Sequence, residues 1–144
     1  MGMGTQYESL AETVRIIAGQ FRGLTLASVG KGDASAHLRP TSDRVRESLF
    51  NVLSKYDALV DAHVLDLFAG TGALGLEALS RGASNVTFVD DGVKAGKLIR
   101  HNVAITETNQ QSRLLRCDAR KLPANTGRPC DVVFLDPPYG KSLG

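Results

Sequence analysis

The stretch HVLDLFAGTGALGLEALSRG, residues 63–82, decides the fold class of this chain. It predicts a strand, a glycine-rich turn and a helix, and the alternation continues in NVTFVD (85–90), VKAGKLIRHNV (93–103), SRLLRCD (112–118) and DVVFLD (131–136). Strands that alternate with helices are typical of a parallel α/β sheet. The strand segments are apolar runs, which favours strands covered on both faces. We therefore expect a doubly wound, mostly parallel α/β core over residues 62–144.

An N-terminal extension over residues 14–56 precedes this core. VRIIAG (14–19) and LTLASV (24–29), joined by QFRG, predict a small β-hairpin. Residues 1–13 are polar and have no clear period, so we expect them to be disordered or frayed.

The extension ends in a segment with helical periodicity, RPTSDRVRESLFNVL (39–53). Thr41 or Ser42 can cap this helix. The apolar positions that share one of its faces are Val45, Leu49, Val52 and Leu53. The pattern predicts an amphipathic helix.

The composition of the 144 residues is that of one soluble domain, with 42% hydrophobic and 22% charged residues. No apolar run is long enough to cross a bilayer, and the first residues do not resemble a secretory signal, so we expect a cytoplasmic protein without membrane contact. Cys117 and Cys130 are too few for a disulfide framework or a zinc site, and we expect reduced cysteines and no metal.

Positive charge gathers in the extension although the whole chain carries only +2. Between Val14 and Arg46, two acids, Asp33 and Asp43, stand against six basic residues, which are Arg15, Arg22, Lys31, Arg39, Arg44 and Arg46. This end of the molecule could meet phosphate, or it could be an ordinary solvated surface. The charge pattern alone does not separate the two.

The glycine-rich turn predicts a nucleotide-containing ligand. Gly70, Gly72 and Gly75 spell GxGxxG between a strand and a helix, which is also the dinucleotide-binding fingerprint. Asp66, near the end of the strand, discriminates between ligands. A carboxylate there would repel a pyrophosphate but attract the ammonium and sulfonium of S-adenosylmethionine. The glycines let the backbone approach the ligand where a Cβ would collide.

Acids at the ends of the next two strands are placed to bind the ribose and the adenine of a nucleoside-containing ligand. Asp90 lies about twenty residues beyond the glycines, where an acid can bind both ribose hydroxyls. Its neighbour Asp91 is the weaker candidate and fits a solvated residue or a helix cap. Asp118 could reach the adenine edge, or it could be a turn residue only.

The segment DPPY, residues 136–139, follows the fourth strand of the core and is the most specific motif. Asp136 and the carbonyl of Pro137 could accept the two hydrogens of an exocyclic base amine and aim its lone pair at a methyl donor. Pro137 and Pro138 fix the shape of the loop. Tyr139 could stack on a target base turned out of its helix. The proton of the alkylated amine can leave to Asp136 or to water.

Together these segments resemble the bacterial small-subunit ribosomal RNA guanine-N2 methyltransferases of the RsmD type. The resemblance extends from about Val14 to Gly144 and rests on RIIAGQFRGLTL, LRPTSDRVRESLFNVL, VLDLFAGTGALGLEALSRGA and DPPYGKSLG. It implies a Rossmann-like class I fold that uses S-adenosylmethionine and acts on 16S RNA or the assembling 30S particle. It also implies that Phe68 joins the cofactor residues, and that the hairpin and residues 39–46 bind RNA and cover the cofactor. The RNA-contacting arginines would then be Arg15, Arg22, Arg39, Arg44 and Arg46.

Members of this fold usually continue past DPPY with further strands, whereas this chain ends at Gly144. We expect a truncated form without the C-terminal strands, or an assembly such as a dimer that covers the edge of the fourth strand. Three other functions remain open: an adenine-N6 methyltransferase acting on DNA or RNA, a nicotinamide-dependent oxidoreductase with the same glycine turn, and an inactive fragment that binds cofactor or RNA.

Overall fold

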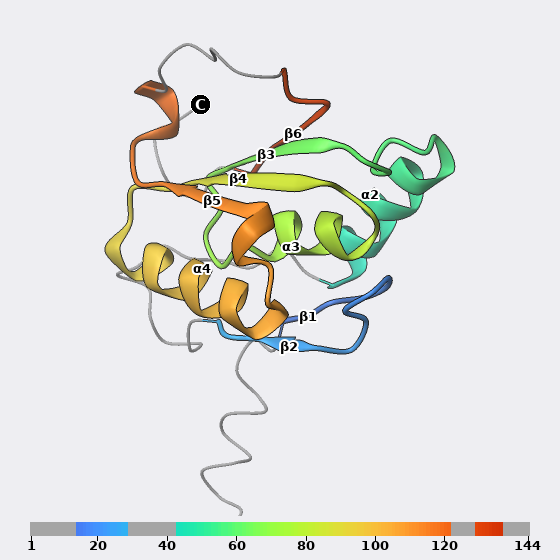
Figure 1. The fold of residues 1–144 in the computed structure, drawn as a ribbon, viewed down its shortest axis with the longest axis horizontal. Coiled ribbons are helices and arrows are strands. Elements are labelled where there is room, and N and C mark those ends of the chain that lie inside the picture. Colours follow the sequence, from blue (N-terminus) through green and yellow to red (C-terminus); the bar gives the residue numbers. More distant parts are fainter. Residues whose placement is uncertain (1–13, 29–42, 122–128, 137–144) are drawn as a thin grey trace, which may run out of the picture.

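The computed structural model describes residues 14–28, 43–121 and 129–136, and within them four parallel strands form one sheet. The strands are β3 (His63–Leu67), β4 (Asn85–Val89), β5 (Ser112–Leu115) and β6 (Val132–Leu135), in the spatial order β5-β4-β3-β6. The chain starts at β3, adds β4 and β5 on one side, and then returns to place β6 on the other side (Figure 1). The predicted doubly wound parallel sheet is confirmed.

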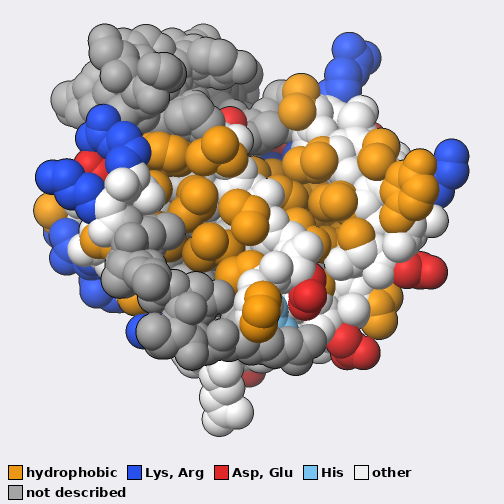
Figure 2. Space-filling model, turned by 90° about the horizontal axis from the view of Figure 1, so that it is seen from above, with side chains coloured by type: hydrophobic (Ala, Val, Ile, Leu, Met, Phe, Trp, Pro, Cys, Tyr) orange, Lys and Arg blue, Asp and Glu red, His pale blue; other side chains and the backbone are white. Residues whose placement is uncertain are grey.

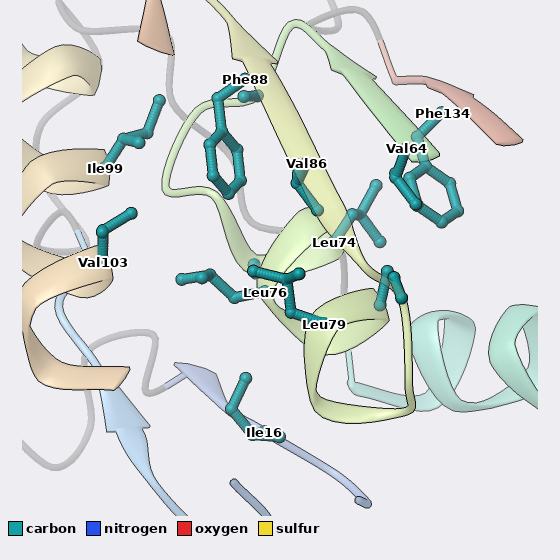
Figure 3. Close-up of a cluster of buried hydrophobic side chains, with 14 of the residues drawn as sticks. Ile16, Val64, Leu74, Leu76, Leu79, Val86, Phe88, Ile99, Val103 and Phe134 are labelled. Carbon is teal, nitrogen blue, oxygen red and sulfur yellow. The ribbon is translucent and has the colours of Figure 1, made fainter. Parts of the chain in front are cut away.

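Helices α3 (Ala73–Ser80) and α4 (Val93–Thr106) lie on the same face of the sheet (Figure 1). Every residue of α3 is buried, because α3 lies between the sheet and the N-terminal segment. Figure 3 shows the core that results, where apolar side chains of β3, β4, β6, α3 and α4 meet Ile16 from the N-terminal segment. Two short 3-10 turns, η2 (Asn109–Gln111) and η3 (Ala119–Lys121), flank β5.

The predicted hairpin is present, with β1 (Val14–Arg15) antiparallel to β2 (Thr25–Leu26). Its strands are shorter than expected because the connecting segment turns away to bond with α3. Gln20 N donates to the carbonyl of Ser80 at 2.7 Å, and Phe21 N donates to the Ser80 hydroxyl at 2.9 Å. At Gly19, which has φ +91°, a Cβ would collide with the same carbonyl. The hairpin is thus docked on α3.

Helix α2 (Asp43–Lys55) confirms the helix predicted from 39–53, while its candidate caps lie outside the described residues. The apolar face predicted for this helix is not the face that the structure buries most. Phe50 and Arg46 are buried, with the Phe50 ring 5.4 Å from that of Phe134 on β6. Three of the four positions on the predicted apolar face are exposed, by 56%, 36% and 55%: Val45, Leu49 and Val52. Phe50 and Arg46, rather than the apolar residues at helical spacing, thus mark the face of α2 that packs on the rest of the protein.

The opposite face of the sheet has no described helix on it. Phe134 points towards α2, but its neighbours Val133 and Leu135 are 52% and 66% exposed. Figure 2 shows apolar side chains spread over the middle of this view. In the described part of the chain the outer face of β6 is therefore exposed, although the apolar run of this strand favoured cover on both faces, whereas Val89 on the outer face of β4 is buried. Among the residues that the structure describes, no helix is both long and apolar enough to span a membrane.

Candidate functional site

Three sequence-predicted residues meet at the carboxyl edge of the sheet. Leu67 of β3 pairs with Val89 of β4 on one side and with Leu135 of β6 on the other. The residues that follow these three, Phe68, Asp90 and Asp136, therefore lie side by side at that edge. Because the chain order reverses between β3 and β6, this is the switch point where open α/β sheets bind ligands.

Asp66 is the second-last residue of β3, next to this edge, and is 1% exposed. Its Oδ2 accepts a hydrogen bond from Gly75 N at 3.0 Å, whereas its Oδ1 is buried and has no hydrogen-bond partner among the described residues. Burial raises the pKa of this carboxyl well above its ordinary value, and the charges of Asp136 and Asp90 raise it further. The free oxygen of Asp66 is thus an electrostatic site for a proton or a cation.

The glycine-rich turn is held by Asp90. Gly70 N donates to Asp90 Oδ2 and Gly92 N donates to Asp90 Oδ1, both at 2.9 Å. The turn needs left-handed backbone at Gly70 (φ +60°) and Gly72 (φ +84°), and also at Phe68 (φ +55°), where a side chain makes that conformation costly. A strained residue fixed next to two carboxylates is typical of a binding site.

Glycine at position 75 is explained by packing within the protein rather than by close approach of the backbone to a ligand. A Cβ there would lie 2.7 Å from Val86 Cγ1 and even closer to the Phe88 ring, both on β4. The glycine is therefore required by close packing of α3 on β4, and it serves the site through the N–H that it donates to Asp66.

Asp118 follows β5 at the same edge, and its carboxylate is already engaged. Arg120 Nε donates to Asp118 Oδ1 at 3.0 Å and Arg120 Nη2 donates to Oδ2 at 2.7 Å. These hydrogen bonds lower the pKa of Asp118 to about 2. An adenine amine would share an acceptor that Arg120 keeps ionised, so the adenine role of Asp118 stays a prediction.

Of the predicted catalytic loop, Asp136 is described and exposed at the end of β6. Pro137, Pro138 and Tyr139 lie outside the described residues. The position of Asp136, in electrostatic contact with Asp66, brings the first residue of DPPY to the cofactor edge.

The structure describes four of the five predicted RNA-contacting arginines, three of them exposed and one buried. Arg15, Arg22 and Arg44 are exposed, and the first two line a hollow of about 250 Å³, while Arg39 lies outside the described residues. The prediction for Arg46 is wrong, because its side chain is 1% exposed and cannot reach RNA in this structure.

Arg46 is instead part of a buried ionic contact. It donates to the carbonyl of Arg15 and, at 3.0 Å, to Asp43, and its Nε lies 3.8 Å from Glu77 Oε1. The guanidinium therefore joins α2 to the hairpin and to α3.

Sequence reasoning missed Glu77, which is fully buried in α3. It accepts hydrogen bonds from Ile17 N at 2.9 Å, from Ala18 N at 3.1 Å and from Arg81 Nε at 2.8 Å. The available signal was a charged residue inside the otherwise apolar helix ALGLEALS, since a helix that is apolar all round is buried and a buried charge requires partners.

Asn102 of α4 was also missed, and it connects the N-terminal segment to the glycine turn. Its Oδ1 accepts from Ala27 N at 2.6 Å, and its Nδ2 donates to the carbonyls of Ala27 at 3.0 Å and Thr71 at 2.8 Å. Its spacing of three residues from Ile99 indicated that it shares the buried face of α4, where an amide must be hydrogen-bonded.

The sheet order, its switch point and the glycine turn held by a carboxylate define the class I methyltransferase fold, a Rossmann-like α/β fold. The chain belongs to the family described as conserved hypothetical protein 95, whose model matches residues 14–144. The family resemblance predicted from the sequence is confirmed.

Named relatives support the same conclusion. Ribosomal RNA small subunit methyltransferase D of Escherichia coli is 44% identical over 131 residues, which cover 90% of this chain and 62% of that protein. The protein of the same name from Haemophilus influenzae is 43% identical, covering 90% of this chain and 66% of its own length. The solved structure of yhhF from Escherichia coli matches with a TM-score of 0.73 at 39% identity, over 92% of this chain and 68% of that one. This chain thus spans about two thirds of the length of these relatives.

Proposed function

We propose that this chain carries the cofactor-binding part of a methyltransferase that moves a methyl group from S-adenosylmethionine to the N2 amine of a guanine in small-subunit ribosomal RNA. The observation that carries the proposal is the buried, unpartnered Oδ1 of Asp66. A carboxylate in that position favours a cationic ligand over a dinucleotide, whose pyrophosphate it would repel.

The residues at the carboxyl edge fit this cofactor. Asp66 would pair with the ammonium of its methionine end, Asp90 would bind the ribose hydroxyls, and Asp118 would accept from the adenine amine. The left-handed glycines and Phe68 would leave the backbone open beneath it. When bound, the cofactor supplies an electrophilic methyl group.

Asp136 is the protein group nearest to the proposed chemistry. The lone pair of an exocyclic base amine is delocalised into the ring, and hydrogen bonds that accept both amine hydrogens favour a pyramidal nitrogen that can attack. Asp136 would accept one hydrogen and the carbonyl of Pro137 the other, and Tyr139 would stack on the base. The amine becomes acidic as it is alkylated, so Asp136 or water then takes its proton.

The RNA substrate is inferred from the relatives, two of which are named as methyltransferases of small-subunit ribosomal RNA. Naked 16S RNA and the assembling 30S particle are the two forms of substrate to compare. Exposed Arg15, Arg22 and Arg44 would contact its phosphates. An adenine-N6 methyltransferase remains the alternative with the same chemistry, since Asp136 can accept from either amine.

The proposal is tested by methyl transfer from labelled S-adenosylmethionine to unmodified 16S RNA, to 30S particles and to duplex DNA. We expect label in RNA guanine, and loss of labelling in Asp136→Ala with cofactor binding retained. Labelling of adenine alone would establish the alternative. A thermal shift with the nicotinamide cofactor but none with S-adenosylmethionine would refute the methyltransferase and support the oxidoreductase. Binding of cofactor and RNA without turnover would support an inactive fragment.

A further inference from the structure

Residues 93–121 are strongly basic, and the proposed function does not use this charge. The segment holds seven Lys and Arg residues against two acids, a net charge of +5 in a chain whose total is +2. One of the acids, Asp118, is already paired with Arg120. All seven basic residues are exposed: Lys94, Lys97, Arg100, Arg113, Arg116, Arg120 and Lys121. We call this surface the α4 strip.

The strip is continuous in space. Arg116, after β5, lies across α4, since a Cβ added at Gly96 would be 3.4 Å from its Nε. Arg120 of η3 is close enough to Asp91, at the start of α4, for that carboxylate to raise its pKa. Figure 2 shows Lys and Arg gathered along the left margin, on the side where α4 and β5 lie in Figure 1.

The placement of these charges is unfavourable for the isolated protein. Lys94 and Lys97 stand in the first turns of α4, where the helix dipole is positive and where the helix itself carries no acidic residue. Lys94, Lys97 and Arg100 follow one another at a spacing of three residues, so like charges are neighbours on one helix surface. An ordinary solvated face would mix signs along this helix, whereas a polyanionic partner relieves both penalties.

The strip begins at the candidate site. Val89 pairs with Leu115, so Arg116 lies level with Asp90 at the carboxyl edge, and the charge then continues down α4 through Lys97 and Arg100. A chain of evenly spaced phosphates that entered the site would pass over these residues.

We infer that the α4 strip binds the phosphate backbone of the RNA next to the methylated nucleotide, as a second contact surface separate from the arginines of residues 14–46. The inference rests on the proposed function for the identity of the polyanion. Each contacted phosphate releases counterions, so the affinity should fall steeply with salt.

The test compares Lys97→Gln/Arg100→Gln with the unchanged full chain. Binding of a fluorescein-labelled 16S RNA stem-loop is measured by anisotropy over a range of salt concentrations. We expect the slope of log affinity against log salt to become shallower by about 1.4 to 1.8, and the affinity at 0.15 M salt to fall about 15- to 30-fold. The control, Lys55→Gln, removes an exposed helical lysine from α2 and should leave the slope within about 0.3 of the unchanged chain.

An unchanged slope in the double variant, an equal change in Lys55→Gln, or no binding of the stem-loop by the unchanged chain would overturn the inference. Equal loss of binding to poly-glutamate would show general charge attraction and overturn it as well. The thermal shift with S-adenosylmethionine should be the same in all three proteins. Salt-dependent RNA binding through the strip without any methyl transfer would leave the strip standing and refute the proposed function.

Discussion

Replacement of Glu77 by alanine should destabilise the protein severely. Glu77 is fully buried and is the acid that faces two arginines, at 2.8 Å from Arg81 and 3.8 Å from Arg46. Its removal leaves the buried Arg46 with Asp43, at 3.0 Å, as the acid that it still contacts, and it takes away the hydrogen-bond acceptor of the N–H groups of Ile17 and Ala18. Breaking a buried ion pair from one side costs about 3–5 kcal/mol. A domain stability of roughly 5–15 kcal/mol would lose a large share of its value.

Urea unfolding followed by circular dichroism measures this loss, with Glu47→Ala, an exposed acid on α2, as the matched control that should shift stability by less than about 0.5 kcal/mol. Arg46→Met should cost less than Glu77→Ala, since Glu77 keeps Arg81 and both backbone donors. The double variant should cost less than the sum of the single losses, because it also removes the buried Arg46 charge that Glu77→Ala leaves with Asp43 alone. A loss below about 1 kcal/mol in Glu77→Ala would refute the reasoning. Full stability of Arg46→Met together with weakened RNA binding would restore Arg46 to the RNA surface.

Three further changes probe the site itself. Asp66→Asn should raise the stability of the ligand-free protein at neutral pH and remove the thermal shift with S-adenosylmethionine. The folded protein raises the pKa of Asp66, so ionisation of this carboxyl costs stability as pH rises above the unfolded value near 3.8. The stability gain of the variant should therefore shrink as pH falls towards that value, and a gain independent of pH would contradict this account. Gly75→Ala should lower the free energy of unfolding by about 1–3 kcal/mol, because its Cβ would clash with β4. Gly96→Ala, where a Cβ meets only a flexible arginine, should raise it by about 0.5 kcal/mol. Equal effects of the two substitutions would count against the packing argument. NMR titration should place the pKa of Asp118 near 2, and in Arg120→Ala the pKa should return towards 3.8. Because the pKa is lowered in the folded protein, the contact with Arg120 stabilises the fold fully above about pH 3.8, and this stabilisation is lost as pH falls towards 2. An unmoved pKa in the variant would exclude Arg120 as the cause.

The convergence of Asp66, Asp90 and Asp136 could be predicted from the sequence. Parallel strands end at one edge, so acids that follow successive strands must meet there, and the observed register places Asp90 and Asp136 on either side of Phe68. The order of the motifs along the chain was sufficient to predict this meeting, because a chain of alternating strands and helices can adopt only a few sheet topologies.

The orientation of α2 could not be predicted in the same way. Apolar spacing pointed to Val45, Leu49 and Val52, whereas the structure buries Phe50 and Arg46. That choice depends on partners far away in the sequence, Glu77 on α3 and Phe134 on β6, which a local periodicity does not contain. For the same reason a count of positive charges could not distinguish a buried arginine from one that faces solvent.

The three hydrogen bonds of Asn102 make the hairpin and the glycine turn one mechanical unit. Its amide holds both backbone groups of Ala27 and the carbonyl of Thr71, and a shift of either end by about an ångström would break a hydrogen bond. A pull on the N-terminal segment is therefore carried by a single side chain into the backbone between Gly70 and Gly72. A displacement of the hairpin is thus transmitted through Asn102 to the glycine-rich turn at the carboxyl edge of the sheet.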